Sequence, residues 1–217
     1  MAHKTVYLIR HAATNGNAEG RYIGRTDEPL GTGLGVHFAE DHHLVCRRKE
    51  NEPLTPSPKV HPSPKVHRVA ASPMKRAVQT AQILFGGMEL TKIEELREID
   101  FGYFEGKNHK ELNGDPVYQA WVDSNGQADI PGGERRSDFV QRSYAGFIKA
   151  LGDPQKDETI AIVCHGGNIM AVLSTLTGKD YYDFQTGNLS GYCLDLETDD
   201  EGIHDLTYTR IDPWDPA

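Results

Sequence analysis

Apolar residues follow two kinds of spacing along the chain. Short runs rich in β-branched and aromatic residues are typical of strands. Strands are predicted at residues 4–10 (KTVYLIR), 67–72 (HRVAAS), 159–165 (TIAIVCH), 191–197 (GYCLDLE) and 203–211 (IHDLTYTRI). The run at 159–165 is apolar almost throughout, which indicates a strand covered on both faces.

Between these runs, apolar residues recur at the three- and four-residue spacing of amphipathic helices. They are Met74, Val78, Ala81 and Phe85 in one segment; Val140, Tyr144, Phe147, Ile148 and Leu151 in a second; and Ile169, Val172, Leu173 and Leu176 in a third. Strands that alternate with helices predict an α/β domain with a mostly parallel central sheet. Because 217 residues suffice for one such core, a single domain is expected over residues 1–217.

Two segments depart from this alternation. Residues 107–131 are polar, contain Gly and Pro, and carry one short helical patch, so they are predicted to form an excursion above the sheet. Residues 31–68 begin with three closely spaced glycines, which disfavour a helix. The pentapeptide SPKVH then occurs twice, and the prolines around it predict an extended surface loop over residues 51–67.

Composition narrows the class of partner. The formal net charge is −9, so most of the surface repels nucleic acid and anionic membranes, although a few arginines can still bind a small anion. Three widely spaced cysteines without a CxxC motif indicate neither a disulfide framework nor a zinc site. The apolar stretch before Arg10 is too short for a signal peptide or a membrane span. A cytoplasmic protein without a nucleic-acid or membrane partner is expected, and its oligomeric state stays open.

The candidate chemistry lies where three predicted strands end. The first run ends in Arg10-His11, the second leads into Arg76, and the third ends in His165. Ligands of open α/β sheets bind beyond the carboxyl ends of strands, near helix N-termini. Two guanidiniums there are suited to phosphate oxygens, and Asn17 adds an amide donor. The pattern therefore predicts a phosphate site.

At these residues the chain resembles a known family. LIRHAATNGN resembles the RHGxTxxN signature of the histidine phosphatase superfamily, the phosphoglycerate-mutase-like enzymes. SPMKRAVQTA, ELREIDFGYFEG, PGGE and CHGG resemble further motifs of the family in the expected order, so the resemblance spans residue 4 to about 197. Ala12 stands where glycine is common, and Phe104 where tryptophan is common. The resemblance implies a three-layer α/β/α domain with a small helical excursion over the site; residues 31–68 depart from the amphipathic helix usual there.

The resemblance also implies residue roles. His11 would be the nucleophile that becomes phosphorylated, Arg10 and Arg76 would hold the phosphoryl oxygens, His165 would complete the cluster, and Glu98 would be the general acid. The scheme requires no metal and no cofactor. Positive groups around an imidazole disfavour its protonation and stabilise charge on the transferring phosphoryl oxygens, which agrees with these roles.

Further residues are assigned around this centre. Expected phosphate or substrate contacts are Asn17, Thr14, Arg21 and Gly166, with Tyr22 beside the substrate and His109 as a candidate contact from the excursion. Glu105 and Asp100 are expected to be structural. The spacing of His42, His43, His61 and His67 does not match a zinc site, so solvated loop histidines are expected.

Three functions are open to such a chain. The first is a phosphomonoesterase that hydrolyses a small phosphorylated metabolite through phosphohistidine; GRYIGRTDEPL and PGGE resemble the branch of α-ribazole and broad-specificity phosphatases. The alternative is a cofactor-dependent phosphoglycerate mutase, which needs a strongly basic cap, whereas residues 107–131 are acidic or neutral apart from Lys107 and Lys110. A non-catalytic phosphate-binding module is disfavoured because His11 and Glu98 are both present. The sequence does not identify the ester.

Overall fold

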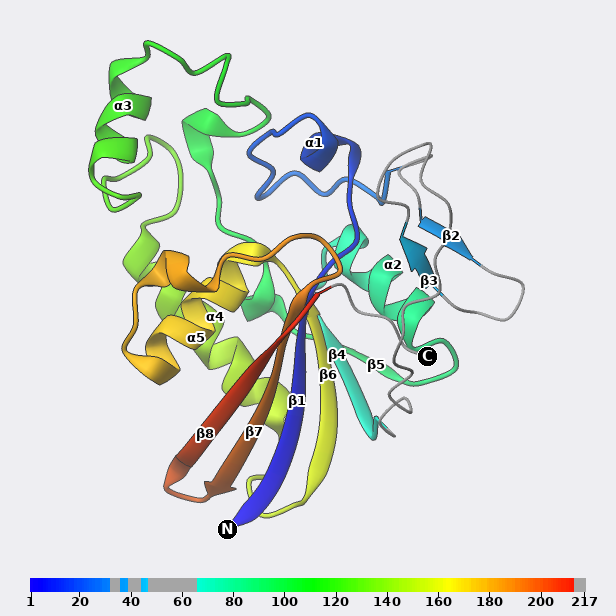
Figure 1. The fold of residues 1–217 in the computed structure, drawn as a ribbon. Helices are drawn as coiled ribbons and strands as arrows, with labels where there is room; N and C mark the ends of the chain where they lie inside the picture. The colour runs from blue at the N-terminus through cyan, green and yellow to red at the C-terminus, as the bar shows by residue number, and fades with distance from the viewer. Residues whose placement is uncertain (32–35, 39–43, 47–65, 213–217) are drawn as a thin grey trace.

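The computed structural model describes residues 1–31, 36–38, 44–46 and 66–212 (Figure 1). Its strands are β1 (Ala2–Arg10), β2 (Val36–Phe38), β3 (Leu44–Cys46), β4 (Arg68–Ala71), β5 (Leu90–Lys92), β6 (Glu158–Cys164), β7 (Gly191–Asp199) and β8 (Gly202–Ile211). Its α-helices are α1 (Asn15–Ala18), α2 (Lys75–Leu84), α3 (Pro116–Asp123), α4 (Arg136–Leu151) and α5 (Gly166–Thr177). Short 3-10 turns are η1 (Glu94–Leu96), η2 (Gly102–Phe104) and η3 (Tyr181–Phe184).

Six strands form one mixed sheet in the order β5-β4-β6-β1-β7-β8. The first four run parallel, whereas β7 pairs antiparallel with β1 and β8 antiparallel with β7. All five predicted strands are present, within two residues at each end. Strand β5 and the β2–β3 hairpin were not predicted, because three-residue strands are too short to carry a periodic signal.

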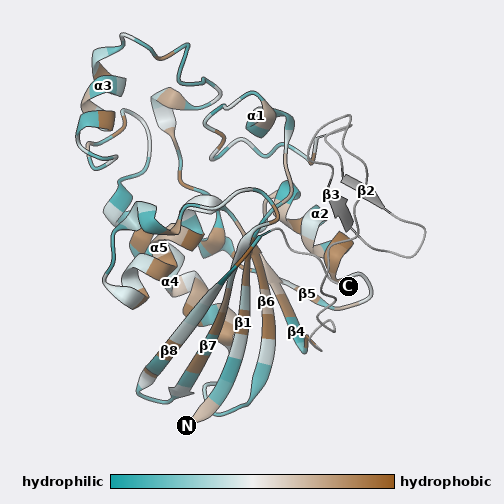
Figure 2. Cartoon of the chain, in the orientation of Figure 1, coloured by the Kyte–Doolittle hydropathy of each residue, from teal (hydrophilic) through white to brown (hydrophobic). Residues whose placement is uncertain are grey.

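Helices cover both faces of this sheet, so the predicted three-layer α/β/α class is confirmed. On one face, Val6 and Leu8 of β1 and Ile162 of β6 pack in a single core with α4 and α5. On the other face, Val69 of β4 and Val163 of β6 pack against α2. Neighbouring residues of β6 thus enter opposite cores, which accounts for its continuous apolar run. Hydropathy follows this arrangement: brown segments gather on the central strands and on α5 (Figure 2).

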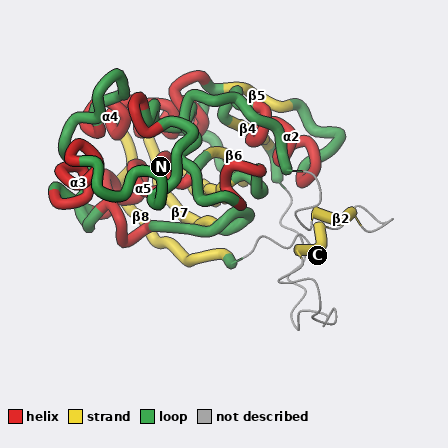
Figure 3. Tube along the Cα trace, turned by 90° about the horizontal axis from the view of Figure 1, so that it is seen from above, coloured by secondary structure: helices red, strands yellow, loops and turns green. Residues whose placement is uncertain are grey.

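The excursion between η2 and α4 carries α3 above the carboxyl edge of the sheet (Figure 1). None of the residues of α3 is buried, and the excursion is held instead by a small cluster of Phe104, Leu112 and Ile130. Seen from above, α3 lies at one end of the molecule and α2 toward the other (Figure 3). The carboxyl ends of β1, β4 and β6 therefore face a space that the excursion partly covers.

Several predictions fall on residues that are only partly described. Residues 51–65 of the proline-rich segment, with His61, and also His42 and His43 lie outside the described residues, so the expected surface loop stays a prediction. His67 is described; its side chain is exposed, and its Nδ1 accepts a hydrogen bond from the Thr159 N–H at 2.9 Å. Within the described residues, no helix has both the length and the apolar character needed to cross a membrane.

Candidate active site

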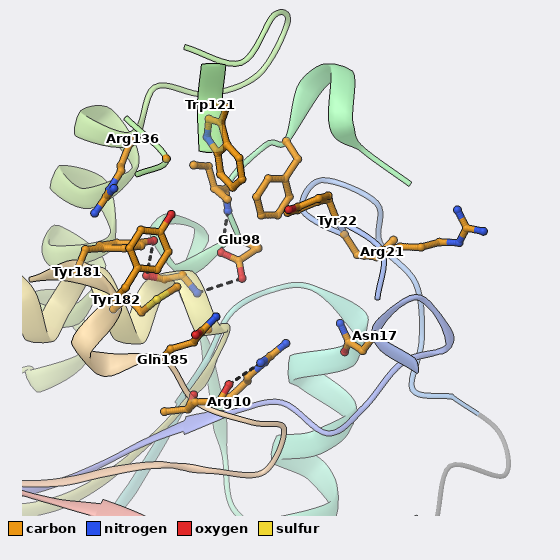
Figure 4. Close-up of a pocket in the computed structure, with 18 of the residues that line it drawn as sticks. Arg10, Asn17, Arg21, Tyr22, Glu98, Trp121, Arg136, Tyr181, Tyr182 and Gln185 are labelled. Carbon is orange, nitrogen blue, oxygen red and sulfur yellow. Dashed lines mark hydrogen bonds between the residues drawn. The ribbon is translucent and has the colours of Figure 1, made fainter. Parts of the chain in front are cut away.

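The predicted site residues converge because three parallel strands end at one edge. Arg10 is the last residue of β1 and pairs in register with Cys164, the last residue of β6. His165 follows as the N-cap of α5, and Arg76 lies in the first turn of α2, which follows β4. Above this edge is a cavity of about 450 Å³ (Figure 4). Its walls include the predicted residues Arg10, His11, Asn17, Arg21, Tyr22, Glu98 and Gly166.

His11 is held as a neutral imidazole with one nitrogen fixed. Its Nδ1 lies 2.7 Å from the Ala12 carbonyl oxygen, which accepts the Nδ1 proton and leaves Nε2 as the nitrogen available toward the cavity. Burial, followed by the guanidiniums of Arg76 and Arg10, holds the pKa of His11 well below its usual value. The Asn188 side chain donates to the His11 carbonyl at 2.9 Å and fixes the backbone. The imidazole is therefore unprotonated at neutral pH.

Arg10 presents a half-buried cation to the same cavity. Its Nη1 donates to the Thr186 carbonyl at 2.6 Å, and Figure 4 shows the guanidinium among the residues that line the floor. Among the described residues, its Nε is buried without a hydrogen-bond partner. A buried donor of this kind is costly unless a ligand oxygen accepts from it. Arg10 is thus placed to bind an anion.

Arg76 and His165 form a deeper layer below His11. Arg76 is 1% exposed; its Nη atoms donate to the backbone carbonyls of Ile23, Gly24 and Thr26, and its Nε donates to His165 Nδ1 at 3.2 Å. Because Nδ1 accepts, His165 Nε2 carries the proton and donates to Ser72 Oγ at 2.8 Å. The His165 ring lies 5.0 Å from that of His11 in an edge-on arrangement. Neither Arg76 nor His165 lines the cavity itself.

Glu98 lies on another wall of the cavity, opposite the floor formed by Arg10 (Figure 4). Its carboxyl group accepts hydrogen bonds from the N–H groups of Ile99 at 3.0 Å and Gly167 at 3.3 Å. Burial raises the pKa of Glu98, and the two N–H groups, Arg76 and Arg10 only partly oppose that shift. A carboxyl group in this position favours its protonated form more than an exposed one does.

Of the other predicted contact residues, two lie at the cavity and two do not present their polar groups to it. Asn17 lines the cavity, and Gly166 opens α5 beside Arg10. The Thr14 hydroxyl is fully buried and caps α1 in a reciprocal bond with Asn17, so the structure does not bring it into the cavity. The guanidinium of Arg21 points away from the cavity in Figure 4 and binds Glu19 and Glu111.

The residues expected to be structural make structural contacts. Glu105 accepts from the N–H groups of Gly24 and Thr26, both at 2.9 Å, and braces that loop. Asp100 accepts from the Gly102 N–H at 2.8 Å. His109 is exposed and is not among the residues that line the cavity. Among the described residues, no group of three or more His, Cys, Asp or Glu side chains is arranged to hold a metal ion.

Most of the aromatic residues around the cavity were not predicted from the sequence. Trp121, Tyr181 and Tyr182 line the cavity with Tyr22, and Arg136 stacks on the Tyr181 ring at 3.9 Å. The loop before β7 was not predicted as part of the site either, although its Thr186 and Asn188 bind Arg10 and His11. Loop residues carry no periodic signal, and the aromatic residues lie on segments that approach one another only in the folded chain.

Comparison with known proteins identifies the family. The model of the histidine phosphatase superfamily (branch 1) matches residues 60–208. The protein named "Probable phosphoglycerate mutase GpmB" of Yersinia pestis (strain Pestoides F) is 31% identical over 179 residues, which are 80% of this chain and 74% of that protein.

Two solved structures share the fold. The α-ribazole phosphatase of Shigella flexneri matches with a TM-score of 0.67 at 24% identity over 95% of each chain. The phosphoserine phosphatase of Entamoeba histolytica, solved with 3-phosphoglyceric acid, matches with a TM-score of 0.67 at 25% identity over 96% of each chain. The chain therefore belongs to the histidine phosphatase superfamily (branch 1) and is a phosphatase enzyme.

Proposed function

We propose that the protein hydrolyses a small phosphate monoester through a phosphohistidine at His11. The observation that carries the proposal is the state of this imidazole: it is neutral, its Nδ1 is fixed by the Ala12 carbonyl, and it lies beside a buried guanidinium. A nucleophile toward phosphorus needs an unprotonated nitrogen in a fixed orientation.

In the first step, His11 Nε2 attacks phosphorus while the bond from phosphorus to the ester oxygen breaks. Arg10 binds the equatorial oxygens from the cavity floor, and Arg76 adds positive charge from the buried layer below. Glu98, with its raised pKa, gives its proton to the departing alkoxide. General acid catalysis of this kind contributes about 10²- to 10⁴-fold.

In the second step, water attacks the phosphohistidine. The Glu98 carboxylate takes a proton from that water, the bond from His11 Nε2 to phosphorus breaks, and inorganic phosphate leaves. Glu98 ends the cycle protonated and His11 ends it neutral, as both began. The chain's own residues thus supply the nucleophile, the acid and the base.

The wall beyond Glu98 favours an uncharged, ring-bearing leaving group. Tyr22 lines the cavity, and its hydroxyl is already bonded to the Tyr118 hydroxyl at 2.9 Å. Trp121 packs against Tyr22 with ring centres 5.7 Å apart, and both lie above Glu98 in Figure 4. Aromatic faces bind planar groups by offset or edge-on stacking. An ester of the α-ribazole phosphate type, with a ring attached to the alcohol, fits this wall.

A phosphoglycerate mutase is the second candidate, favoured by the name of the Yersinia pestis relative. A phosphoglycerate carries a carboxylate that needs a further cation. Among the described residues lining the cavity there is no lysine, and Arg21 is bound to carboxylates outside it. Arg136 is stacked on Tyr181 and donates to the Asn125 carbonyl. Hydrolysis is therefore the stronger candidate.

The test has two parts. Wild type and His11→Ala are incubated with an aryl phosphate in the presence of a chelator, and the enzyme is examined for an acid-labile phosphoryl group. Turnover and labelling in the wild type, both abolished in His11→Ala, are expected; residual phosphoenzyme in the variant would refute the assignment of the nucleophile.

A substrate panel then separates the two candidate functions. It contains α-ribazole phosphate, sugar phosphates and 3-phosphoglycerate, with and without bisphosphoglycerate. Faster interconversion of phosphoglycerates than release of phosphate from any ester would establish the mutase instead.

A further inference from the structure

Glu98 lies on a segment that does not hold itself in place. It follows the short turn η1 and belongs to no helix or strand. The carboxyl group is tethered by two N–H groups, one of which belongs to the next residue, Ile99. A general acid must be held to within about 0.5 Å of its productive position, so such a segment needs external support.

That support comes from Arg142 of α4. Its Nη1 donates to the carbonyls of Glu95 at 2.8 Å and Arg97 at 2.7 Å, and its Nη2 donates to the carbonyl of Glu98 itself at 3.2 Å. One rigid guanidinium thus binds three carbonyls within four consecutive residues. A planar fork fixes the direction of each bond, which a single ammonium cannot do.

Glu134 completes the arrangement from the opposite side. Its carboxylate accepts from Arg142 Nε at 2.8 Å and from Nη2 at 2.7 Å, so all five guanidinium donors of Arg142 are used. The Glu134 N–H donates to the Asp100 carbonyl at 2.9 Å, two residues beyond Glu98. The pair therefore holds the chain on both sides of the carboxylic acid.

Neither residue reaches the substrate cavity. Arg142 and Glu134 line a separate, smaller cavity of about 280 Å³, and Glu98 lies on the walls of both. Their most direct path to the reacting groups therefore runs through Glu98.

We propose that Arg142 and Glu134 are positioning residues that fix the carboxyl group of Glu98 against the ester oxygen. The proposal rests on the role of Glu98 as general acid in the proposed function. Loss of the pair should slow the steps that need a proton from Glu98 and leave substrate binding unchanged. Displacement by about 1 Å can cost on the order of 100-fold in rate.

The test compares Arg142→Lys, Glu134→Gln and Glu98→Gln on two esters of one aryl series, one with an activated leaving group and one with a poor one. The measured quantity is the rate of alcohol release in the first turnover, before Glu98 acts as the base toward water. Both positioning variants are expected to lose roughly 10- to 100-fold in the rate of alcohol release from the ester with the poor leaving group. They should lose less than about threefold in that rate on the activated ester, whose alcohol departs without a proton. KM should stay near the wild-type value for both esters, because neither substituted residue lines the substrate cavity.

Lys149→Met is the matched control. Lys149 lies two turns further along α4 and also reaches the segment before Glu98. Within the described residues it binds the half-buried carboxylate of Glu95, at 3.1 and 3.2 Å, and no backbone carbonyl. Wild-type kinetics are expected for this variant. Urea denaturation of each variant measures the folded fraction, and Glu134→Gln, which keeps size and shape, decides the question if Arg142→Lys does not fold.

The experiment distinguishes failure of the positioning role from failure of the acid role of Glu98. Equal losses on both esters in Glu134→Gln, with Glu98→Gln still selective for the poor leaving group, would overturn the positioning role and leave the proposed function standing. If Glu98→Gln itself slows alcohol release from both esters equally, Glu98 is not the general acid, and the role that the proposed function gives it fails.

Discussion

A side chain added at Gly167 would collide with the proposed general acid, which gives the most demanding prediction about the site. A Cβ atom at this position in the first turn of α5 would lie 2.2 Å from Glu98 Oε1 and 2.9 Å from an atom of the Phe139 ring. Cβ atoms essentially never lie closer than 3.0 Å to another heavy atom of this kind, so the carboxyl group must move in Gly167→Ala. A displacement of about 1 Å predicts a loss of roughly 100-fold in kcat for an ester with a poor leaving group.

The assay is steady-state hydrolysis of paired aryl phosphates by Gly167→Ala, Gly166→Ala and the double variant Gly167→Ala/Glu98→Gln. Gly166 is the matched position: it begins the same helix, and its Cβ atom would lie 3.6 Å from the nearest atoms of Arg10, an ordinary contact. A much smaller loss is therefore expected for Gly166→Ala. If the Gly167 substitution acts through Glu98, its effect should nearly vanish in the Glu98→Gln background, because coupled residues are not additive.

Stability must be measured beside the rates. Overpacking against Phe139 can lower the free energy of unfolding by about 1–3 kcal/mol, whereas replacing glycine by alanine within a helix raises it by about 0.5–1 kcal/mol. The variant should therefore remain folded at room temperature, as urea denaturation will report. Wild-type kcat on the poor leaving group in folded Gly167→Ala would show that Glu98 is not in contact with Gly167 during catalysis, and the geometry of the acid would be wrong.

Three further predictions concern pH, the aromatic wall and the excursion. The pKa values of His11 and His165 are held below 6.5 in the folded protein, so the unfolded chain binds more protons as the pH falls; the free energy of unfolding should decrease below pH 6.5. The raised pKa of Glu98 acts in the opposite direction, because the folded protein then binds the extra proton. Urea denaturation at several pH values is therefore best done in Glu98→Gln. An unchanged free energy of unfolding in that variant would contradict the prediction. Trp121→Ala should raise KM at least several-fold for ring-bearing esters and leave KM for a small aliphatic phosphate unchanged; an equal change in both would exclude the ring subsite. Phe104→Ala should cost about 3–5 kcal/mol in unfolding free energy, because this fully buried ring anchors the excursion, and a loss below about 1 kcal/mol would mean that the cluster does not support it.

The fold class and the centre of the site could be predicted from the sequence because both depend on local patterns. Continuous apolar runs specify buried strands, and helical spacing specifies the helices between them. Arg10 and His11 could be placed together with His165 because parallel strands bring their carboxyl ends to one edge, whatever the length of chain between them. The antiparallel outer strands β7 and β8 could be predicted as strands, although their direction could not.

Other features were decided only in the folded molecule. Thr14 and Arg21 stand in a motif that binds phosphate by resemblance, yet one caps α1 and the other binds carboxylates outside the cavity. Three of the five donors of Arg142 meet carbonyls some 45 residues earlier in the chain, and nothing in the local sequence of α4 distinguishes this arginine from a solvated one. The sequence determined which strands are buried and which residues end them, because periodicity and strand polarity are local properties. The tertiary structure alone decided which polar groups are left for a substrate, because that depends on whether each donor and acceptor has already found a partner elsewhere in the chain.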